Sequence, residues 1–147
     1  MLDDAKIWIL SADRAKAKIY EWLPQNNFLE ELTSFEEADA RKHEHELKAD
    51  RPGHGNNPTS RYAVEDKASY KLQASQKFLK GIAEFLSKDE SFSNYEKLVI
   101  IAQDGVYKDV YDHLSSGAQD KIIQHLAKDL TNLPQQDVAD YFVKYRQ

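Results

Sequence analysis

The chain has 147 residues, no cysteine and a formal net charge of -5 at pH 7. Without thiols it can form no disulfide, use no cysteine nucleophile and hold no cysteine-based zinc site. Its longest apolar runs, of about six residues, are too short to cross a bilayer, so we expect no membrane insertion. Asp3 and Asp4 lie where a secretory signal would carry basic residues, which favours a cytoplasmic protein. The length predicts one domain over residues 1–147.

The first part of the sequence predicts three strands joined by short connections. A continuous apolar run within residues 6–11 is typical of a strand buried on both faces. Residues 17–22 alternate between apolar and polar types, which predicts a second strand. The turn residues of 24–27 separate it from a third strand over about 28–35. We therefore expect an antiparallel meander.

Helical periodicity follows a long polar stretch over about residues 36–60, which we expect to form a mobile basic loop. Apolar residues at three- and four-residue spacing predict a helix from about Glu65 to Ser87, and they are Ala74, Phe78, Ile82, Phe85 and Leu86. Residues 97–102 are the clearest buried strand, and Asp104-Gly105 closes it.

Three shorter elements complete the chain. A short amphipathic helix from Val106 to Leu114 is predicted to end at Ser116-Gly117. Residues 122–127 are read as an edge strand, although their pattern also suits a helix. A last helix follows Leu133-Pro134 and carries Val138 and Phe142.

The fold class is therefore mixed α/β. A β-β-β meander followed by α-β-α-β-α predicts a mixed sheet with helices on its faces, in a ribonuclease H-like arrangement. Most aromatic residues fall at core-facing spacing, which indicates packing rather than base stacking, and they are Trp8, Trp22, Phe78, Phe85 and Phe142. Tyr62, beside Arg61, is the exception.

The segment from Arg41 to Arg61 differs in charge from the rest of the chain. It has five Lys or Arg against three Asp or Glu, a net charge of +2, whereas the remainder carries -7. Glycine-rich backbone beside cationic side chains is typical of phosphate and anion contact. The candidate contacts are Arg41, Lys42, Lys48, Arg51, Gly53, His54, Gly55 and Arg61. A long surface loop without a ligand is the alternative.

The centre of this segment suits a tight turn. Pro52 and Gly53 fit successive positions of a type II turn, and Gly55 allows close backbone approach. Arg51 and His54 would flank a ligand, while Asp50 is better explained by capping the turn.

Other chemistry has weaker support. His43 and His45, with His54 and Asp50, could hold zinc or nickel. A His-x-His pair in a charged stretch is usually solvated, however, so we expect no metal site and no cofactor. Asp13 and Asp104 follow strands, as the acids of a two-metal nuclease would, yet Asp is also common at strand ends. His54 is the one weak catalytic candidate, and a non-enzymatic role is favoured.

Several motifs together resemble the bacterial host-attachment protein family. They are Ala12-Asp13-Arg14-Ala15, Asp50-Arg51-Pro52-Gly53, Leu98-Val99-Ile100-Ile101-Ala102 and Lys128-Asp129-Leu130-Thr131 with Leu133-Pro134. The resemblance spans nearly the whole chain. It departs from the family pattern at His54, where the family often has Arg, and at Tyr107-Lys108, where it usually has Leu-Gly.

The family is also similar to the middle domain of archaeal and eukaryotic class I release factors. In those factors a loop between the third strand and the first helix carries a Gly-Gly-Gln motif that reaches the peptidyl-transferase centre. Here Gly53-His54-Gly55-Asn56 takes that place. The resemblance implies contact of the basic loop with tRNA or the ribosome. A peptidyl-tRNA hydrolase, a metal nuclease and a protein-interaction module acting indirectly on attachment remain alternatives.

Overall fold

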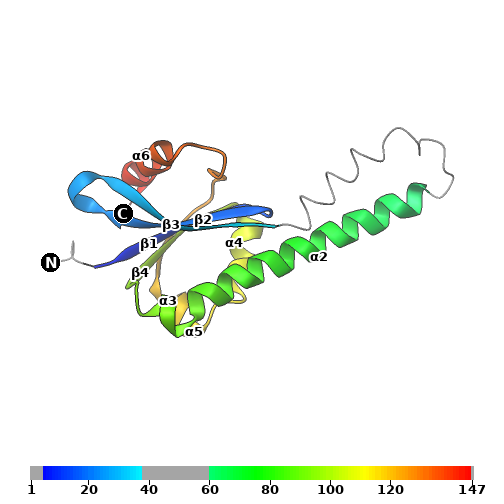
Figure 1. The fold of residues 1–147 in the computed structure, drawn as a ribbon, viewed down its shortest axis with the longest axis horizontal. Coiled ribbons are helices and arrows are strands. Elements are labelled where there is room, and N and C mark those ends of the chain that lie inside the picture. The colour runs from blue at the N-terminus through cyan, green and yellow to red at the C-terminus, as the bar shows by residue number, and fades with distance from the viewer. Residues whose placement is uncertain (1–4, 38–59, 147) are drawn as a thin grey trace.

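A five-stranded mixed sheet with helices on both faces forms the body of the protein (Figure 1). The computed structural model describes residues 5–37 and 60–146, and the side chains of residues 60–69 lie outside that description. The strands are β1 (Ile7–Ala12), β2 (Lys16–Leu23), β3 (Phe28–Glu36), β4 (Lys97–Ile101) and β5 (Ile122–Leu126), in the spatial order β3-β2-β1-β4-β5.

The first three strands form the predicted meander. β1 pairs antiparallel with β2, and β2 pairs antiparallel with β3. The connection between β2 and β3 is a short 3₁₀ helix, η2 (Pro24–Asn26), which confirms the predicted turn. Asn27 closes it in the left-handed region with φ 48°, a conformation that asparagine tolerates better than most residues.

The later strands extend the sheet in parallel. β4 pairs with β1, and β5 pairs with β4, both in parallel register. β5 lies at the edge of the sheet, which confirms its prediction as an edge strand. β1 and β4 are buried along almost their entire length because helices cover both of their faces.

Two apolar cores lie on the two faces of the sheet. The first face is covered by α2 (Ser60–Ser87), α4 (Asp104–Tyr111) and α5 (Ser116–Lys121), and α3 (Asp89–Phe92) follows α2. Leu10, Leu98 and Ile100 of the sheet pack there with the apolar stripe of α2, which contributes Leu79, Ile82, Ala83 and Leu86. The second face is covered by α6 (Gln135–Tyr145).

Aromatic residues contribute to both cores. On the second face, Phe142 packs edge-on against Trp22 with 5.0 Å between ring centroids, and on the first face Trp8 stacks on Tyr95 at the same separation. The predicted core role is confirmed for Trp8, Trp22 and Phe142, which are buried. Phe78 and Phe85 are partly buried against the core of the first face.

Two predicted boundaries were wrong, whereas β3 ends at Glu36, paired with Lys16, in agreement with the end predicted at about residue 35. α2 begins at Ser60 rather than near Glu65, because a helix end that extends past the sheet needs no apolar stripe to be helical. Ser116 and Gly117 begin α5 instead of ending a helix, since the Ser115 hydroxyl accepts a hydrogen bond from the Ala118 amide and caps the new helix.

Two short helices escaped prediction because of their length. α3 and α5 have four and six residues, too few to display a helical period. Gly117 of α5 lies close to Phe92 of α3, and a Cβ at this glycine would lie 3.0 Å from the ring. The close approach favours a glycine at this position, because the Phe92 ring would have to move to admit a Cβ.

Candidate functional site

The carboxyl edge of the sheet brings together segments that are far apart in the sequence. β1, β4 and β5 are parallel, so their carboxyl ends lie at one edge, where open α/β sheets commonly bind ligands. The turn between β1 and β2, the start of α4 and the segment after β5 all meet there.

Asp13 organises the turn between β1 and β2. Its Oδ1 accepts hydrogen bonds from the amides of Ala15 and Lys16, both at 2.7 Å. Its Oδ2 accepts a hydrogen bond from the Thr131 hydroxyl at 2.8 Å. Both carboxylate oxygens therefore have a structural role, because they hold the turn and attach the segment after β5 to it.

A second contact joins the same two segments. The ammonium group of Lys16 donates to the side-chain carbonyl of Asn132, and the Thr131 hydroxyl also lies 2.6 Å from Asp129 Oδ1. The two motifs that carried the family resemblance at the start and near the end of the sequence are thus in direct contact in the fold.

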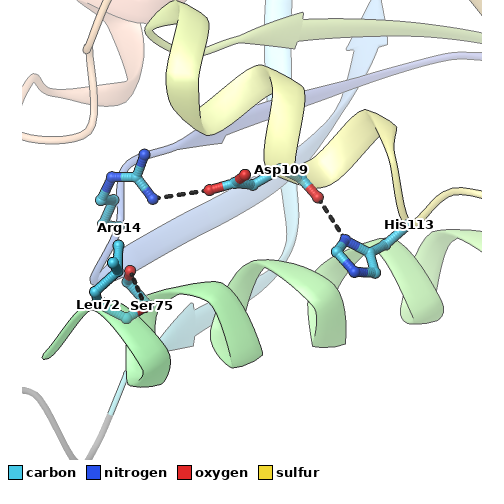
Figure 2. Close-up of polar contacts among 5 residues, drawn as sticks. All are labelled: Arg14, Leu72, Ser75, Asp109 and His113. Atoms are coloured by element: carbon cyan, nitrogen blue, oxygen red, sulfur yellow. Dashed lines mark hydrogen bonds and ion pairs between the residues drawn. The ribbon is translucent and has the colours of Figure 1, made fainter. Parts of the chain in front are cut away.

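Arg14 points to the opposite face of the sheet. Its guanidinium donates to Asp109 Oδ2 on α4 at 2.9 Å, and Figure 2 shows this pair above α2. A Cβ at Gly105 would lie 3.0 Å from Arg14 Nη2, so the guanidinium lies directly over the first turn of α4. The Arg14 side chain is 43% exposed, so this ion pair contributes little to stability and leaves the cation accessible.

Further polar contacts near Arg14 lie within the individual helical segments. His113 Nδ1 donates to the Asp109 carbonyl at 2.8 Å, and the Ser75 hydroxyl donates to the Leu72 carbonyl at 2.9 Å (Figure 2). Each donor thus has a backbone partner three or four residues earlier in its own segment. These contacts stabilise the end of α4 and the middle of α2 locally.

His125 and Tyr107 form the other side of the edge. Their rings stack with centroids 3.9 Å apart and an angle of 8° between the planes, and His125 Nε2 donates to the Ala102 carbonyl at 2.7 Å. Burial, and to a lesser extent the neighbouring Tyr111, raises the pKa of Tyr107. The stack joins α4 to β5, and the hydrogen bond to Ala102 holds β5 against the residue that follows β4.

The part of the chain that leads into the predicted basic segment lies at this edge. The Glu37 amide donates to the Ala15 carbonyl at 2.7 Å, which fixes the exit of β3 beside the Asp13 turn. The candidate residues Arg41, Lys42, Lys48, Arg51, Gly53, His54 and Gly55 lie outside the described residues, as do Asp50, His43 and His45. Arg61 lies within α2, but its side chain, like that of Tyr62, is outside the description.

The structure bears on the metal hypotheses only where it describes side chains. Within that part of the chain, no group of three His, Asp or Glu residues could hold a metal ion. Asp104 is the first residue of α4, and Asp13 is already engaged by three donors. Both positions agree with the ordinary structural role of Asp at the ends of strands.

Sequence reasoning missed two pairs of neighbours, Arg14 with Asp109 and Lys16 with Asn132. Arg14 was noted only as part of a family-like motif, and the partners lie 95 and 116 residues apart along the chain. Their proximity depends on the parallel pairing of β1, β4 and β5, which no local pattern encodes.

The class of protein is thus a mixed α/β domain whose polar contacts gather at the carboxyl edge of its sheet. The comparison with protein families matches residues 8–142 to the family described as "Protein required for attachment to host cells". The match covers most of the chain, and the protein belongs to this family. A search of the curated proteins found no match. In the described part of the chain, no helix is both long and apolar enough to cross a membrane.

Proposed function

We propose that this host-attachment-family protein is a non-enzymatic cytoplasmic domain that contacts RNA, on tRNA or the ribosome, through the basic segment between β3 and α2. The family membership does not by itself specify a molecular activity. Support for an RNA contact comes from the composition of residues 41–61 and from the positions of the chain on either side of them.

The topology of the sheet carries the proposal. β3 lies antiparallel to β2 and so ends at the carboxyl edge of β1. α2 leads through α3 into the start of β4, at the opposite edge, where the Glu96 amide donates to the Lys6 carbonyl. α2 therefore starts on the carboxyl side of the sheet, beyond its edge, and the basic segment connects the end of β3 to this start.

α2 extends this side of the molecule outward. Ser75 is its first buried residue among those with described side chains, and Tyr70 and Leu72 are exposed. The preceding part of the helix, residues 60–74, is about 20 Å long at a rise of about 1.5 Å per residue. Figure 1 shows the amino-terminal end of α2 reaching well beyond the sheet. A helix in this position supports contact with a large partner.

The charge distribution supports a polyanion as that partner. The segment 41–61 carries +2 in a chain of -5, and the partly exposed Arg14 lies at the same edge. Lys and Arg contacts to phosphates provide most of the sequence-independent affinity for nucleic acid. The negative charge of the remaining surface would restrict such contact to this edge.

The proposal includes a finer likeness of fold. The meander, the long connection and the alternating helices and strands have the order expected for a ribonuclease H-like domain and for the middle domain of class I release factors. The connection follows the third strand and precedes the first long helix, as in those factors. Because Gly53-His54-Gly55-Asn56 stands in place of Gly-Gly-Gln, we propose contact without ester hydrolysis.

Binding of fluorescently labelled tRNA, measured by anisotropy over a series of salt concentrations, tests the proposal. We expect the logarithm of the affinity to fall linearly with the logarithm of the salt concentration. Arg51→Ala should weaken binding and reduce the slope by about one. Lys144→Ala, which removes an exposed lysine near the end of α6, is the matched control and should leave the slope unchanged.

Two results would contradict the proposal. An absence of tRNA and ribosome binding at low salt would exclude a phosphate contact and favour a protein-interaction module. Release of the aminoacyl or peptidyl group from tRNA by the wild-type chain, abolished by His54→Ala, would instead show a hydrolase.

A further inference from the structure

A polar cavity of about 310 Å³ lies on the α6 face of the sheet, beside the Asp13 turn. This volume is within the range of small-molecule sites, at its lower end. The polar side chains that line it come from all three strands of the meander and from the segment after β5, and they are Ser11, Lys16, Lys18, Ser34, Glu36 and Thr131.

The strand register explains why these side chains share one face. Ser11 pairs with Lys18, and Lys18 pairs with Ser34, so the three residues form one row across β1, β2 and β3. Residues paired across a sheet project to the same side. Lys16 and Glu36 form the next row toward the edge. Further along the same face, the next row is Ile9, Tyr20 and Glu31, and beyond it Trp22 lies opposite Leu29 beneath α6.

Ser11 is the unusual member of this group. It is 2% exposed, and its Oγ has no hydrogen-bond partner among the described residues. A buried hydroxyl without a partner is costly, and an apolar residue at this position would continue the apolar pattern of Ile7 and Ile9 on the same face. Binding of a ligand that accepts a hydrogen bond from this hydroxyl would explain why a serine is present at this position.

The cations at the cavity have incomplete partners. Lys16 donates to Asn132, whose amide oxygen is neutral and does not balance the charge of the ammonium group. Lys18 lies 3.4 Å from Glu31 Oε1 in an exposed pair, which is weak and easily exchanged. Glu36 adds a carboxylate at the rim, and a carboxylate has about four lone-pair sites for hydroxyl donors.

We propose that this cavity binds a small sugar phosphate, with Lys16 and Lys18 holding the phosphate, Ser11 and Ser34 donating hydrogen bonds to its oxygens, and Glu36 accepting hydrogen bonds from the sugar hydroxyls. Ammonium and hydroxyl donors suit a phosphate ester, whereas the carboxylate disfavours a ligand that is anionic throughout. The site does not depend on the proposed RNA contact, because its residues lie on β1, β2, β3 and Thr131 rather than in the segment 41–61.

Titration of the isotopically labelled full chain with ribose 5-phosphate, followed by NMR, tests the site. We expect saturable shifts at the amides of Ser11, Lys18 and Ser34, and no shifts with ribose. The variant Lys18→Gln should weaken binding about tenfold through the loss of a charge-assisted hydrogen bond. Lys80→Gln, an exposed lysine on α2 outside the cavity, is the matched control and should bind like the wild type.

Ser34→Ala provides a second variant that removes one hydroxyl without altering charge, and it should weaken ribose 5-phosphate binding several-fold. Circular dichroism shows whether each variant is folded. The proposal is overturned if ribose 5-phosphate causes no saturable shifts, if the shifts map outside the three-strand row, or if Lys18→Gln and Lys80→Gln weaken binding equally. Equal affinity for ribose 5-phosphate and inorganic phosphate would also overturn the assignment to a sugar phosphate.

Discussion

Replacing Asp13 by alanine should destabilise the protein, because this side chain joins the first turn to the segment after β5. The change removes two hydrogen bonds to the amides of Ala15 and Lys16 and one from the Thr131 hydroxyl. The carboxylate is only partly buried, so water replaces some of what is lost. At about 1 kcal/mol for each bond, the free energy of unfolding should fall by about 2–3 kcal/mol.

Thermal unfolding followed by circular dichroism measures the effect. For a chain of this size, about 1 kcal/mol corresponds to about 2–4 °C in Tm, so Asp13→Ala should unfold about 5–10 °C below the wild type. Asp13→Asn is the matched control, since its amide oxygen can still accept hydrogen bonds from the turn amides. Its decrease in Tm should be about half that of Asp13→Ala.

A double-mutant cycle isolates the link between the two segments. Combining Asp13→Ala with Thr131→Val should show a coupling energy of about 1 kcal/mol, because each single change already removes the hydrogen bond between these two side chains. A Tm for Asp13→Ala within about 1 °C of the wild type, or strictly additive losses in the cycle, would refute the view that Asp13 organises this edge.

Three further predictions concern stability. Ser11→Ala should raise Tm by about 2–4 °C, because it removes a buried hydroxyl without a partner. Ser75→Ala should not raise Tm, because the Ser75 hydroxyl is hydrogen-bonded in the wild type. A lower Tm for Ser11→Ala would contradict this prediction. Gly117→Ala should lower the free energy of unfolding by about 1–2 kcal/mol through overpacking. Gly81→Ala, with open space around it, should raise the free energy of unfolding by up to about 1 kcal/mol. Equal changes in the two variants, measured by denaturant unfolding, would contradict this prediction. Burial raises the pKa of Tyr95 to about 12, so the unfolded chain loses this proton first and the free energy of unfolding should fall as pH rises from 10 toward 12. Denaturant unfolding of Tyr95→Phe should show a shallower fall with pH. The same fall in Tyr95→Phe and the wild type would oppose the assignment of this pH dependence to Tyr95.

The strands could be predicted well because their burial is visible in local patterns. Both faces of β1 and β4 are covered, so each reads as a continuous apolar run. The turn at Pro24 and the stripe of α2 were equally clear. Short helices such as α3, and the first turns of α2, could not be predicted, because they have too few residues, or too little contact with the sheet, to impose a period.

The candidate site was predicted only in part. Charge and glycine content identified the segment 41–61 in the sequence, and most of it lies outside the described residues. The contacts of Asp13 with Thr131 and of Arg14 with Asp109 could not be foreseen, because they depend on how the strands are ordered. The row of Ser11, Lys18 and Ser34 likewise depends on register, and one residue of slippage would move Lys18 to the other face.

Whether the basic segment 41–61 binds RNA is tested most directly by the amount of nucleic acid that copurifies with the protein. Wild-type chain purified at low salt should carry RNA, seen in its ultraviolet absorbance, and a folded variant lacking residues 44–58 should carry little. Wild-type protein free of RNA, or equal amounts of RNA on the two proteins, would contradict the proposed contact.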